Sequence, residues 1–255
     1  MNIIVCYKIA AEEQDIVVRQ DRTLSFERAE WKIGQYDLNA VEAGVKIMEE
    51  VGGKVSALSV GDKTLDNSKL KKSILSRGPS DLCLVIDENL KDADTYLTAL
   101  TLAGAARKIG FDLILCGEGS ADLYNQQVGI QLGEMLGVPV VNAVSKITPQ
   151  GESILVERNL EDEVEVLEIS LPAVVSVSSD INISRIPGMK EILGASKKPV
   201  VTWTLQDLEV VDDTKRLKLE SVLAPEQMDR KKIILESDSA ENIAVFCEYI
   251  RKELR

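Results

Sequence analysis

The first half of the chain alternates short apolar runs with amphipathic stretches. Four near-continuous apolar runs have the length and composition of buried strands: residues 3–7, 55–60, 82–86 and 113–116. Between them, residues 37–51, 65–76 and 96–109 carry apolar side chains at helical spacing. Strands that alternate with helices in this way predict right-handed βαβ units and a parallel sheet with both faces covered.

The pattern changes after Pro139. Three further strands are expected at residues 140–147, 153–158 and 164–169, and an acidic turn joins the last two into an antiparallel ribbon. A buried strand at 171–177 and a short helix at 189–195 follow, and residues 16–26 predict a small hairpin. We therefore predict an α/β fold with a doubly wound, mostly parallel sheet and an antiparallel ribbon.

The composition shifts again near residue 206. From there to residue 255 the chain is charged and poorly periodic, apart from one amphipathic helix at 240–252. Such a segment exposes apolar surface unless another element covers it. We therefore predict two parts: an α/β nucleotide-binding core over residues 1–205, and a C-terminal arm over residues 206–255 that packs on a partner subunit.

A glycine-rich loop at residues 117–127 follows the fourth predicted strand and leads into a helical pattern that starts at Val128. The first backbone N–H groups of a helix are unpaired, and the helix dipole favours an anion such as a phosphate beside them. An ordinary strand-to-helix turn would have a similar composition, and the loop matches neither the Walker pattern nor G-x-G-x-x-G. From the loop alone, both interpretations stay open.

The expected winding of the sheet points to the same loop. If the fourth strand lies beside the first, the winding reverses between them, and ligands in such sheets bind outside the carboxyl ends of the strands at that point. Cys6, Tyr7 and Lys8 would lie there with the loop. We expect Asp37 to cap the following helix, whereas Asp122 caps a helix at Asn125, contacts the ligand, or does both.

Composition and charge narrow the function classes. The 255-residue chain has 45% hydrophobic residues and a net charge of -12, so a nucleic-acid partner is not expected. It contains no histidine, which excludes Ser-His and Cys-His nucleophile pairs, and its four cysteines show no metal spacing. With no leader and no apolar run of membrane-spanning length, we expect a cytoplasmic protein that holds a cofactor.

Residues 180–195 form a polar segment that contains Pro187 and Gly188 and suits an exposed loop. Met189 lies at its tip, where an apolar residue is unexpected and a flexible thioether would adapt to a partner pocket. We therefore expect Ile186, Met189 and Lys190 to dock a partner protein. The alternative is that Met189 turns inward and packs under the short helix.

Several separated segments resemble the β subunit of electron-transfer flavoproteins, and most closely its Fix-type branch, associated with carnitine and acyl-CoA metabolism. The segments occur in the family's order over about the first 205 residues: Val5-Cys6-Tyr7-Lys8, Tyr36-Asp37-Leu38-Asn39, Ala57-Leu58-Ser59-Val60-Gly61, Leu75-Ser76-Arg77-Gly78-Pro79, residues 117–129, Val156-Glu157-Arg158, Leu171-Pro172-Ala173-Val174-Val175 and Arg185-Ile186-Pro187-Gly188-Met189-Lys190. The chain departs from the family at Gly34-Gln35, where Asn-Pro is common, and at Tyr124, where a second acid is common.

The resemblance implies a heterodimer whose α subunit carries the redox FAD. The β subunit clasps that FAD and holds a second adenine nucleotide, either AMP or a second FAD. A flavin dehydrogenase is the implied electron donor, and the loop after the strand at 171–177 is the family's docking element. Carried over position by position, the implied nucleotide contacts are Cys6, Gly34, Gln35, Tyr36, Asp37, Val60, Gly117, Gly119, Ser120, Ala121, Asp122, Leu123, Tyr124, Asn125, Gln126, Gln127 and Val128. Lys8 is added to these contacts only because it lies where the winding of the predicted sheet reverses.

Three function classes follow from the sequence. The resemblance favours an electron-transfer subunit without catalytic residues of its own. The second class is a free-standing module that senses AMP or ATP, which would have no use for the ribbon and the arm. The third class, an enzyme that activates its substrate with ATP, would need a triphosphate loop or a cluster of metal-binding carboxylates, and the sequence shows neither.

Overall fold

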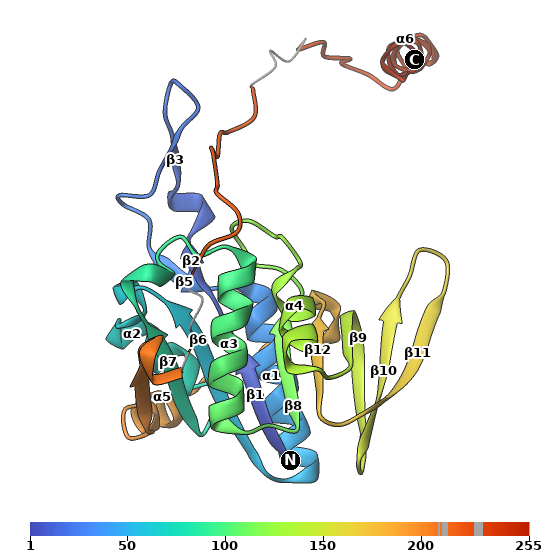
Figure 1. The fold of residues 1–255 in the computed structure, drawn as a ribbon. Coiled ribbons are helices and arrows are strands. Elements are labelled where there is room, and N and C mark those ends of the chain that lie inside the picture. Colours follow the sequence, from blue (N-terminus) through green and yellow to red (C-terminus); the bar gives the residue numbers. More distant parts are fainter. Residues whose placement is uncertain (209, 211–213, 227–231, 255) are drawn as a thin grey trace. The chain divides into compact units, whose positions relative to one another are not determined.

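The computed structural model describes residues 1–208, 210, 214–226 and 232–254 (Figure 1). The chain divides into two units. The first consists of Met1–Val17 and Ser25–Ser221, and it holds the main sheet and the candidate site. The second consists of Val18–Leu24 and Val222–Arg255.

A nine-stranded sheet forms the centre of the first unit, in the order β11-β10-β9-β12-β8-β1-β6-β7-β13. Its strands are β1 (Asn2–Cys6), β6 (Lys54–Gly61), β7 (Asp81–Ile86), β8 (Leu113–Gly117), β9 (Val140–Gln150), β10 (Ser153–Asn159), β11 (Val164–Ser170), β12 (Ala173–Val177) and β13 (Val200–Trp203). All neighbouring pairs are parallel except those of β10 with β9 and with β11. The predicted fold class, including the antiparallel ribbon, is confirmed.

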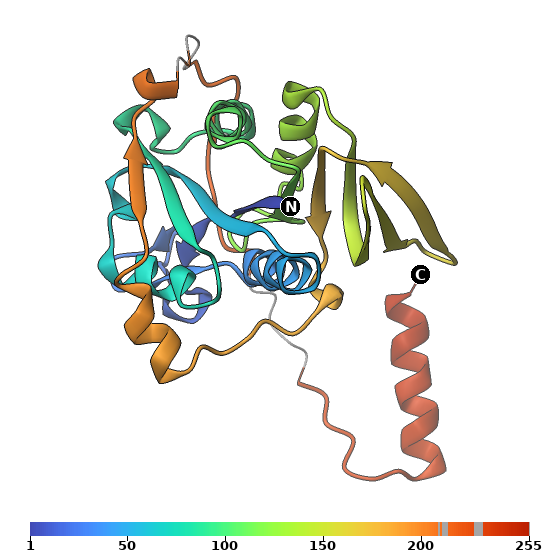
Figure 2. The same cartoon turned by 90° about the horizontal axis from the view of Figure 1, so that it is seen from below.

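Helices cover both faces of this sheet (Figure 2). The helices of the first unit are α1 (Gln35–Val51), α2 (Ser68–Leu75), α3 (Thr95–Ile109), α4 (Val128–Leu136) and α5 (Met189–Ala195). Alternate residues of β1 explain the layering, because Ile3 and Val5 pack in the cluster with α1 and α2, whereas Ile4 and Cys6 pack with α3 and α4. Because β1 is buried on both faces, its sequence is a continuous apolar run.

Two helices begin elsewhere than predicted. α1 starts at Gln35 with Gly34 as its N-cap residue, so Asp37 lies inside the first turn and does not cap the helix. α2 starts at Ser68, because the Asn67 side chain accepts hydrogen bonds from the N–H groups of residues 69 and 70 and so fixes the start there. A separate 3-10 turn precedes it at Lys63–Leu65.

Two small sheets lie between β1 and α1. β2 (Ile9–Ala11) pairs antiparallel with β5 (Trp31–Ile33), which the sequence did not indicate. β3 (Val17–Val18) and β4 (Leu24–Ser25) form the other, as the predicted hairpin requires.

The second unit contains helix α6 (Ala240–Glu253). Ser239 caps this helix by accepting a hydrogen bond from the Asn242 N–H at 3.3 Å. Within the described span 240–253 no residue is buried, and the exposed apolar side chains include those of Ile243, Phe246 and Ile250. Elsewhere in this unit, Arg22 forms an ion pair with Glu226 at 3.0 Å.

The prediction of a partner-binding arm over residues 206–255 stays a prediction. Residues that follow the predicted boundary belong to the first unit up to Ser221. For example, the Leu217 N–H donates to the Asp94 carboxylate at 2.7 Å, at the start of α3. Among the described residues, no helix is long and apolar enough to cross a bilayer.

Candidate functional site

The carboxyl ends of β1 and β8 lie side by side, because β1 pairs with β6 on one side and with β8 on the other. The chain leaves β1 toward β6 and β7 and later returns to β8, so the winding reverses at this point as predicted. Lys8, Gly117 and the first turn of α1 meet there. The sequence-predicted residues of three distant segments are therefore brought together.

Asp37 connects these three segments. Its side chain is buried, with 7% of the residue exposed, and its Oδ2 accepts the Lys8 backbone N–H at 2.7 Å. The Gly117 N–H donates to the same carboxylate. Burial raises the pKa of Asp37 to about 7, and the two N–H bonds offset part of that shift. Asp37 therefore fixes the start of α1 against the ends of β1 and β8.

The glycine at position 117 is required by this contact. A Cβ atom there would lie 2.5 Å from Asp37 Oδ1 and 2.8 Å from the Cβ of Tyr36, closer than atoms of those types approach. Gly34, at the start of α1, is less constrained, since an added Cβ would lie 3.3 Å from Asp37 Oδ2 and 3.8 Å from Ala121. The Gly34 N–H also donates to the Lys8 carbonyl at 3.3 Å.

Lys8 and Asp122 hold the loop 117–127 against the end of β1. Lys8 Nζ donates to both carboxylate oxygens of Asp122, at 2.8 and 2.6 Å, and the Leu123 N–H donates to one of them at 2.8 Å. Burial alone would raise the pKa of Asp122, but hydrogen bonds from Lys8 and Ser120 outweigh it and lower that pKa. Asp122 does not cap a helix at Asn125, because α4 begins only at Val128.

The start of α4 faces this loop without a side-chain cap. Gln127 occupies the N-cap position and makes no capping hydrogen bond, and instead its Oε1 accepts a hydrogen bond from Thr95 at 3.0 Å. The backbone N–H groups of the first turn, from Val128 onward, therefore lack an intrahelical acceptor. This turn can hold an anion, since unpaired N–H groups and the positive end of the helix dipole point the same way.

Tyr124 covers part of the loop. Its ring lies against Gly119, where an added Cβ would come within 2.4 Å of the ring, and its centroid is 5.4 Å from that of Tyr36. The Tyr124 hydroxyl bonds to the Glu118 carboxylate, which also accepts from Gln126 Nε2 at 3.1 Å. The hydrogen bond to Glu118 raises the pKa of Tyr124. Both Tyr124 (φ 47°) and Gln126 (φ 57°) occupy the left-handed region, so their backbone is strained.

Two further predicted contacts, Cys6 and Val60, lie at strand ends beside this site. Cys6 is the last residue of β1, and its thiol is buried and hydrogen-bonded to Cys116, both of which raise its pKa. Cys6 therefore contributes shape rather than reactive sulfur. Val60 lies near the end of β6, and the neighbouring Ser59 hydroxyl donates to the Tyr7 carbonyl at 2.7 Å.

The predicted docking segment is a second exposed feature of the first unit. Ile183, Ile186 and Met189 are 92%, 93% and 74% exposed, so Met189 does not turn inward to pack under α5. Lys190 is exposed in the first turn of α5. Sequence reasoning foresaw the exposed loop from its Pro and Gly content, but it did not show what holds the loop in place.

Contacts with α1 hold this segment. Asn182 and Asn39 exchange hydrogen bonds, with Asn39 Nδ2 donating to the Asn182 carbonyl at 2.7 Å and Asn182 Nδ2 donating to the Asn39 carbonyl at 3.0 Å. Arg185 donates to Glu42 at 2.7 Å and to Glu49 at 2.9 Å, and these bonds raise the pKa of Arg185. Glu42 and Glu49 lie seven residues apart on one face of α1. This spacing could have indicated that a cation pairs with them, but not that the cation is Arg185.

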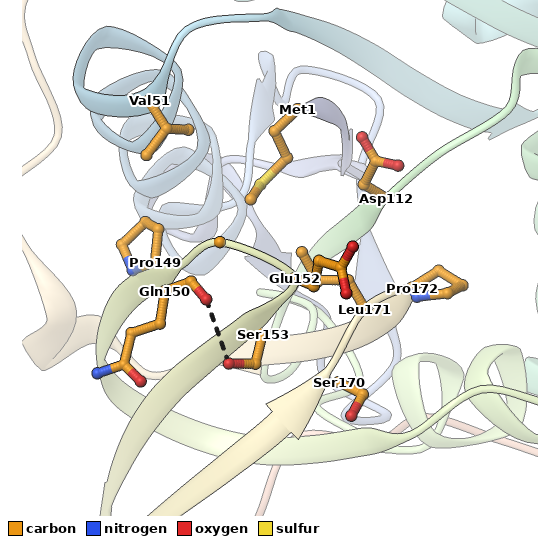
Figure 3. A pocket seen from close by; sticks show the side chains of 11 residues that line it. Met1, Val51, Asp112, Pro149, Gln150, Glu152, Ser153, Ser170, Leu171 and Pro172 are labelled. Atoms are coloured by element: carbon orange, nitrogen blue, oxygen red, sulfur yellow. Dashed lines mark hydrogen bonds between the residues drawn. The ribbon is translucent and has the colours of Figure 1, made fainter.

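A separate cavity lies at the amino ends of β1, β8 and β12 (Figure 3). It measures about 880 Å³, and its lining comes from residues just before these strands, the end of α1, the β9–β10 turn and the end of β11: Met1, Val51, Asp112, Pro149, Gln150, Gly151, Glu152, Ser153, Ser170, Leu171 and Pro172. Asp112 already accepts the Asn2 N–H at 2.6 Å. This open hollow contains no helix N-terminus, and we regard the carboxyl edge as the functional one.

Residues 23–208 match the family model described as the electron transfer flavoprotein domain. The matched region covers most of the chain and includes α1, the loop 117–127 and the docking segment. The chain therefore belongs to the electron transfer flavoprotein domain family.

Proposed function

We propose that this chain is the β subunit of a heterodimeric electron-transfer flavoprotein of the Fix-type branch. It passes electrons from an acyl-CoA-type dehydrogenase, or a similar donor, to a redox acceptor. The family membership supports an electron-carrier role. The β assignment and the branch rest on the segments quoted above, among them Leu75-Ser76-Arg77-Gly78-Pro79 and Arg185-Ile186-Pro187-Gly188-Met189-Lys190.

The observation that carries this proposal is the uncapped start of α4 beside the loop that Lys8 and Asp122 hold in place. A phosphate of AMP or of a second FAD fits there on backbone N–H groups, beside the loop in which the Tyr124 ring packs on Gly119. Because Asp122 already neutralises Lys8, the N–H groups rather than the lysine would supply most of the attraction. The adenosine part would contact the segment that contains Gly34, Gln35 and Tyr36.

The chain's partner would be the α subunit, which carries the redox FAD that both subunits enclose. Helix α6 supports such an assembly, because every residue from Ala240 to Glu253 is at least partly exposed and one face carries Ile243, Phe246 and Ile250. In the other unit, Ile186, Met189 and Lys190 are proposed to dock the flavin dehydrogenase, since the Arg185 and Asn182 contacts hold their apolar side chains outward.

Co-expression with an α subunit tests this function. We expect a yellow heterodimer that loses its redox flavin when either chain is absent, together with one adenine nucleotide per β chain. A chain that purifies alone, binds AMP or ATP reversibly and never retains flavin with an α subunit would instead support the sensor class.

A further inference from the structure

Helix α2 packs against α5, and a small cavity of about 280 Å³ lies there. Its lining residues come from α2, from the two residues that follow it, and from the segment that contains α5: Lys69, Lys72, Ser73, Ser76, Arg77, Pro187 and Ile192. Most of the surface that faces this cavity is apolar, and three of the lining residues are cations, directly beside the proposed docking segment.

Arg77 is partly buried at this cavity and has no carboxylate partner among the residues that the structure describes. Its NH1 group donates to the Ser73 carbonyl at 2.7 Å and to the Ser73 hydroxyl at 3.0 Å. Its Nε is buried and has no hydrogen-bond partner among the described residues. Burial lowers the pKa of Arg77, and no carboxylate acts against that shift. A guanidinium held partly out of water is stabilised when an anion pairs with it.

The surroundings favour an anion as well. Residues 67–80 contain four cations and no carboxylate, in a chain whose net charge is -12. The Lys72 ammonium has no hydrogen bond or ion pair within the described part of the chain, whereas that of Lys69 pairs with Glu30 in an exposed contact. Lys198 adds a second partly buried cation at the end of α2, where its Nζ donates to the Leu75 and Pro79 carbonyls at 2.7 and 2.6 Å.

The apolar surface of the cavity decides which kind of anion fits. Ile192 lies three residues after Met189 on α5, so the two side chains lie on one face of the helix. The side chains of Ile186, Met189 and Leu193 are exposed. A small hydrophilic anion would leave this apolar surface in water, whereas a protein surface would cover it. We propose that the cavity binds a carboxylate side chain of the dehydrogenase, while Ile186 and Met189 contact an apolar patch beside that carboxylate.

This inference rests on the proposed function and adds the chemistry of the partner surface. The selecting feature is charge complementarity: a cationic cavity on an otherwise acidic protein admits an acidic residue and rejects a basic one. The partner's matching surface is thus an exposed Asp or Glu next to large apolar side chains.

The test uses the assembled heterodimer and an acyl-CoA dehydrogenase that reduces its flavin. We expect Lys72→Gln to raise the KM for the heterodimer roughly threefold and Arg77→Gln about tenfold, with unchanged flavin content. Lys71→Gln is the matched control, because Lys71 lies on the same helix, pairs with Asp66 and does not line the cavity. The Lys72→Gln effect should disappear at about 0.5 M salt, where exposed charges are screened.

Equal KM values for Lys72→Gln and the wild type would overturn the inference, and so would an equal loss in Lys71→Gln. A titration with sodium acetate, monitored by NMR through the Arg77 Nε–H resonance, tests whether the cavity binds a small anion instead. Saturable acetate binding together with wild-type reduction rates in Arg77→Gln would assign the cavity to a small anion and refute protein docking. A heterodimer that contains no flavin would overturn the proposed function itself, before any KM is measured.

Discussion

The buried Asp37 carboxylate makes the stability of the chain depend on pH in a way that one substitution removes. In the folded chain its pKa is raised from 3.8 to about 7, chiefly by burial. Between these two values the folded state keeps a proton that the unfolded state has lost. The free energy of unfolding therefore falls as pH rises through this window, and it levels off above pH 7.

The expected size follows from the shift itself. Each pH unit well inside the window changes the free energy of unfolding by about 1.4 kcal/mol, and the slope halves at the folded pKa, so the Asp37 contribution falls by about 2 kcal/mol between pH 5 and pH 7. Because Asp37 is buried, solvent screening does not reduce this figure much. Asp37→Asn cannot ionise and should lack this slope. It should also be less stable at pH 5, since one amide NH2 would oppose a backbone N–H of Lys8 or Gly117.

The effect is measured as the free energy of unfolding in urea, for the wild type and for Asp37→Asn, from pH 5 to pH 8. The contributions of the other titrating groups cancel in the difference between the two proteins. We expect the stability advantage of the wild type to shrink by about 2–3 kcal/mol over this range. A difference that does not change with pH would refute the reasoning. It would mean that the N–H groups of Lys8 and Gly117 outweigh burial and keep Asp37 ionised throughout.

Three further predictions concern the nucleotide, the partner subunit and the docking segment. Gly119→Val should abolish nucleotide retention because its side chain would displace the Tyr124 ring, whereas Lys8→Ala should weaken retention less. The nucleotide content of the purified variants is compared with that of the wild type. A Gly119→Val protein that retains as much nucleotide as the wild type would contradict the assigned site. Deletion of residues 222–255 should leave the first unit folded by circular dichroism but prevent co-purification with the α subunit, and an intact heterodimer would count against the role of α6. Met189→Ala should slow flavin reduction by the dehydrogenase without lowering the melting temperature, because Met189 is 74% exposed. A variant that is less stable but is reduced at the wild-type rate would contradict the docking role.

The central strands β1, β6, β7, β8 and β12 were predictable because they are buried on both faces and therefore appear as continuous apolar runs. The ribbon was predictable from its alternation and its acidic turn. By contrast, β13 and the pair β2–β5 are short and depend on their neighbours, since strands of three or four residues carry too little pattern.

Within the site, the sequence located the loop and the switch point, because both follow from the order of elements. It misassigned Asp37 as a helix cap, since an acid at the start of an apolar helix is a common N-cap signal. What decides its position are the N–H groups of Lys8, which lies 29 residues earlier in the chain between β1 and β2, and of Gly117 at the end of β8. The contacts of Arg185 with Glu42 and Glu49 span more than 130 residues and leave no local signal.

The identity of the retained nucleotide decides whether this chain holds an adenine nucleotide at the carboxyl ends of β1 and β8. The heterodimer is purified without added nucleotide, denatured, and its released small molecules are measured by mass spectrometry against the β-chain concentration. The account predicts one AMP, or one FAD beyond the redox FAD, per β chain, and its loss in Gly119→Val. A wild-type heterodimer that releases no adenine nucleotide beyond the redox FAD, and whose melting temperature added AMP or FAD does not raise, would contradict it.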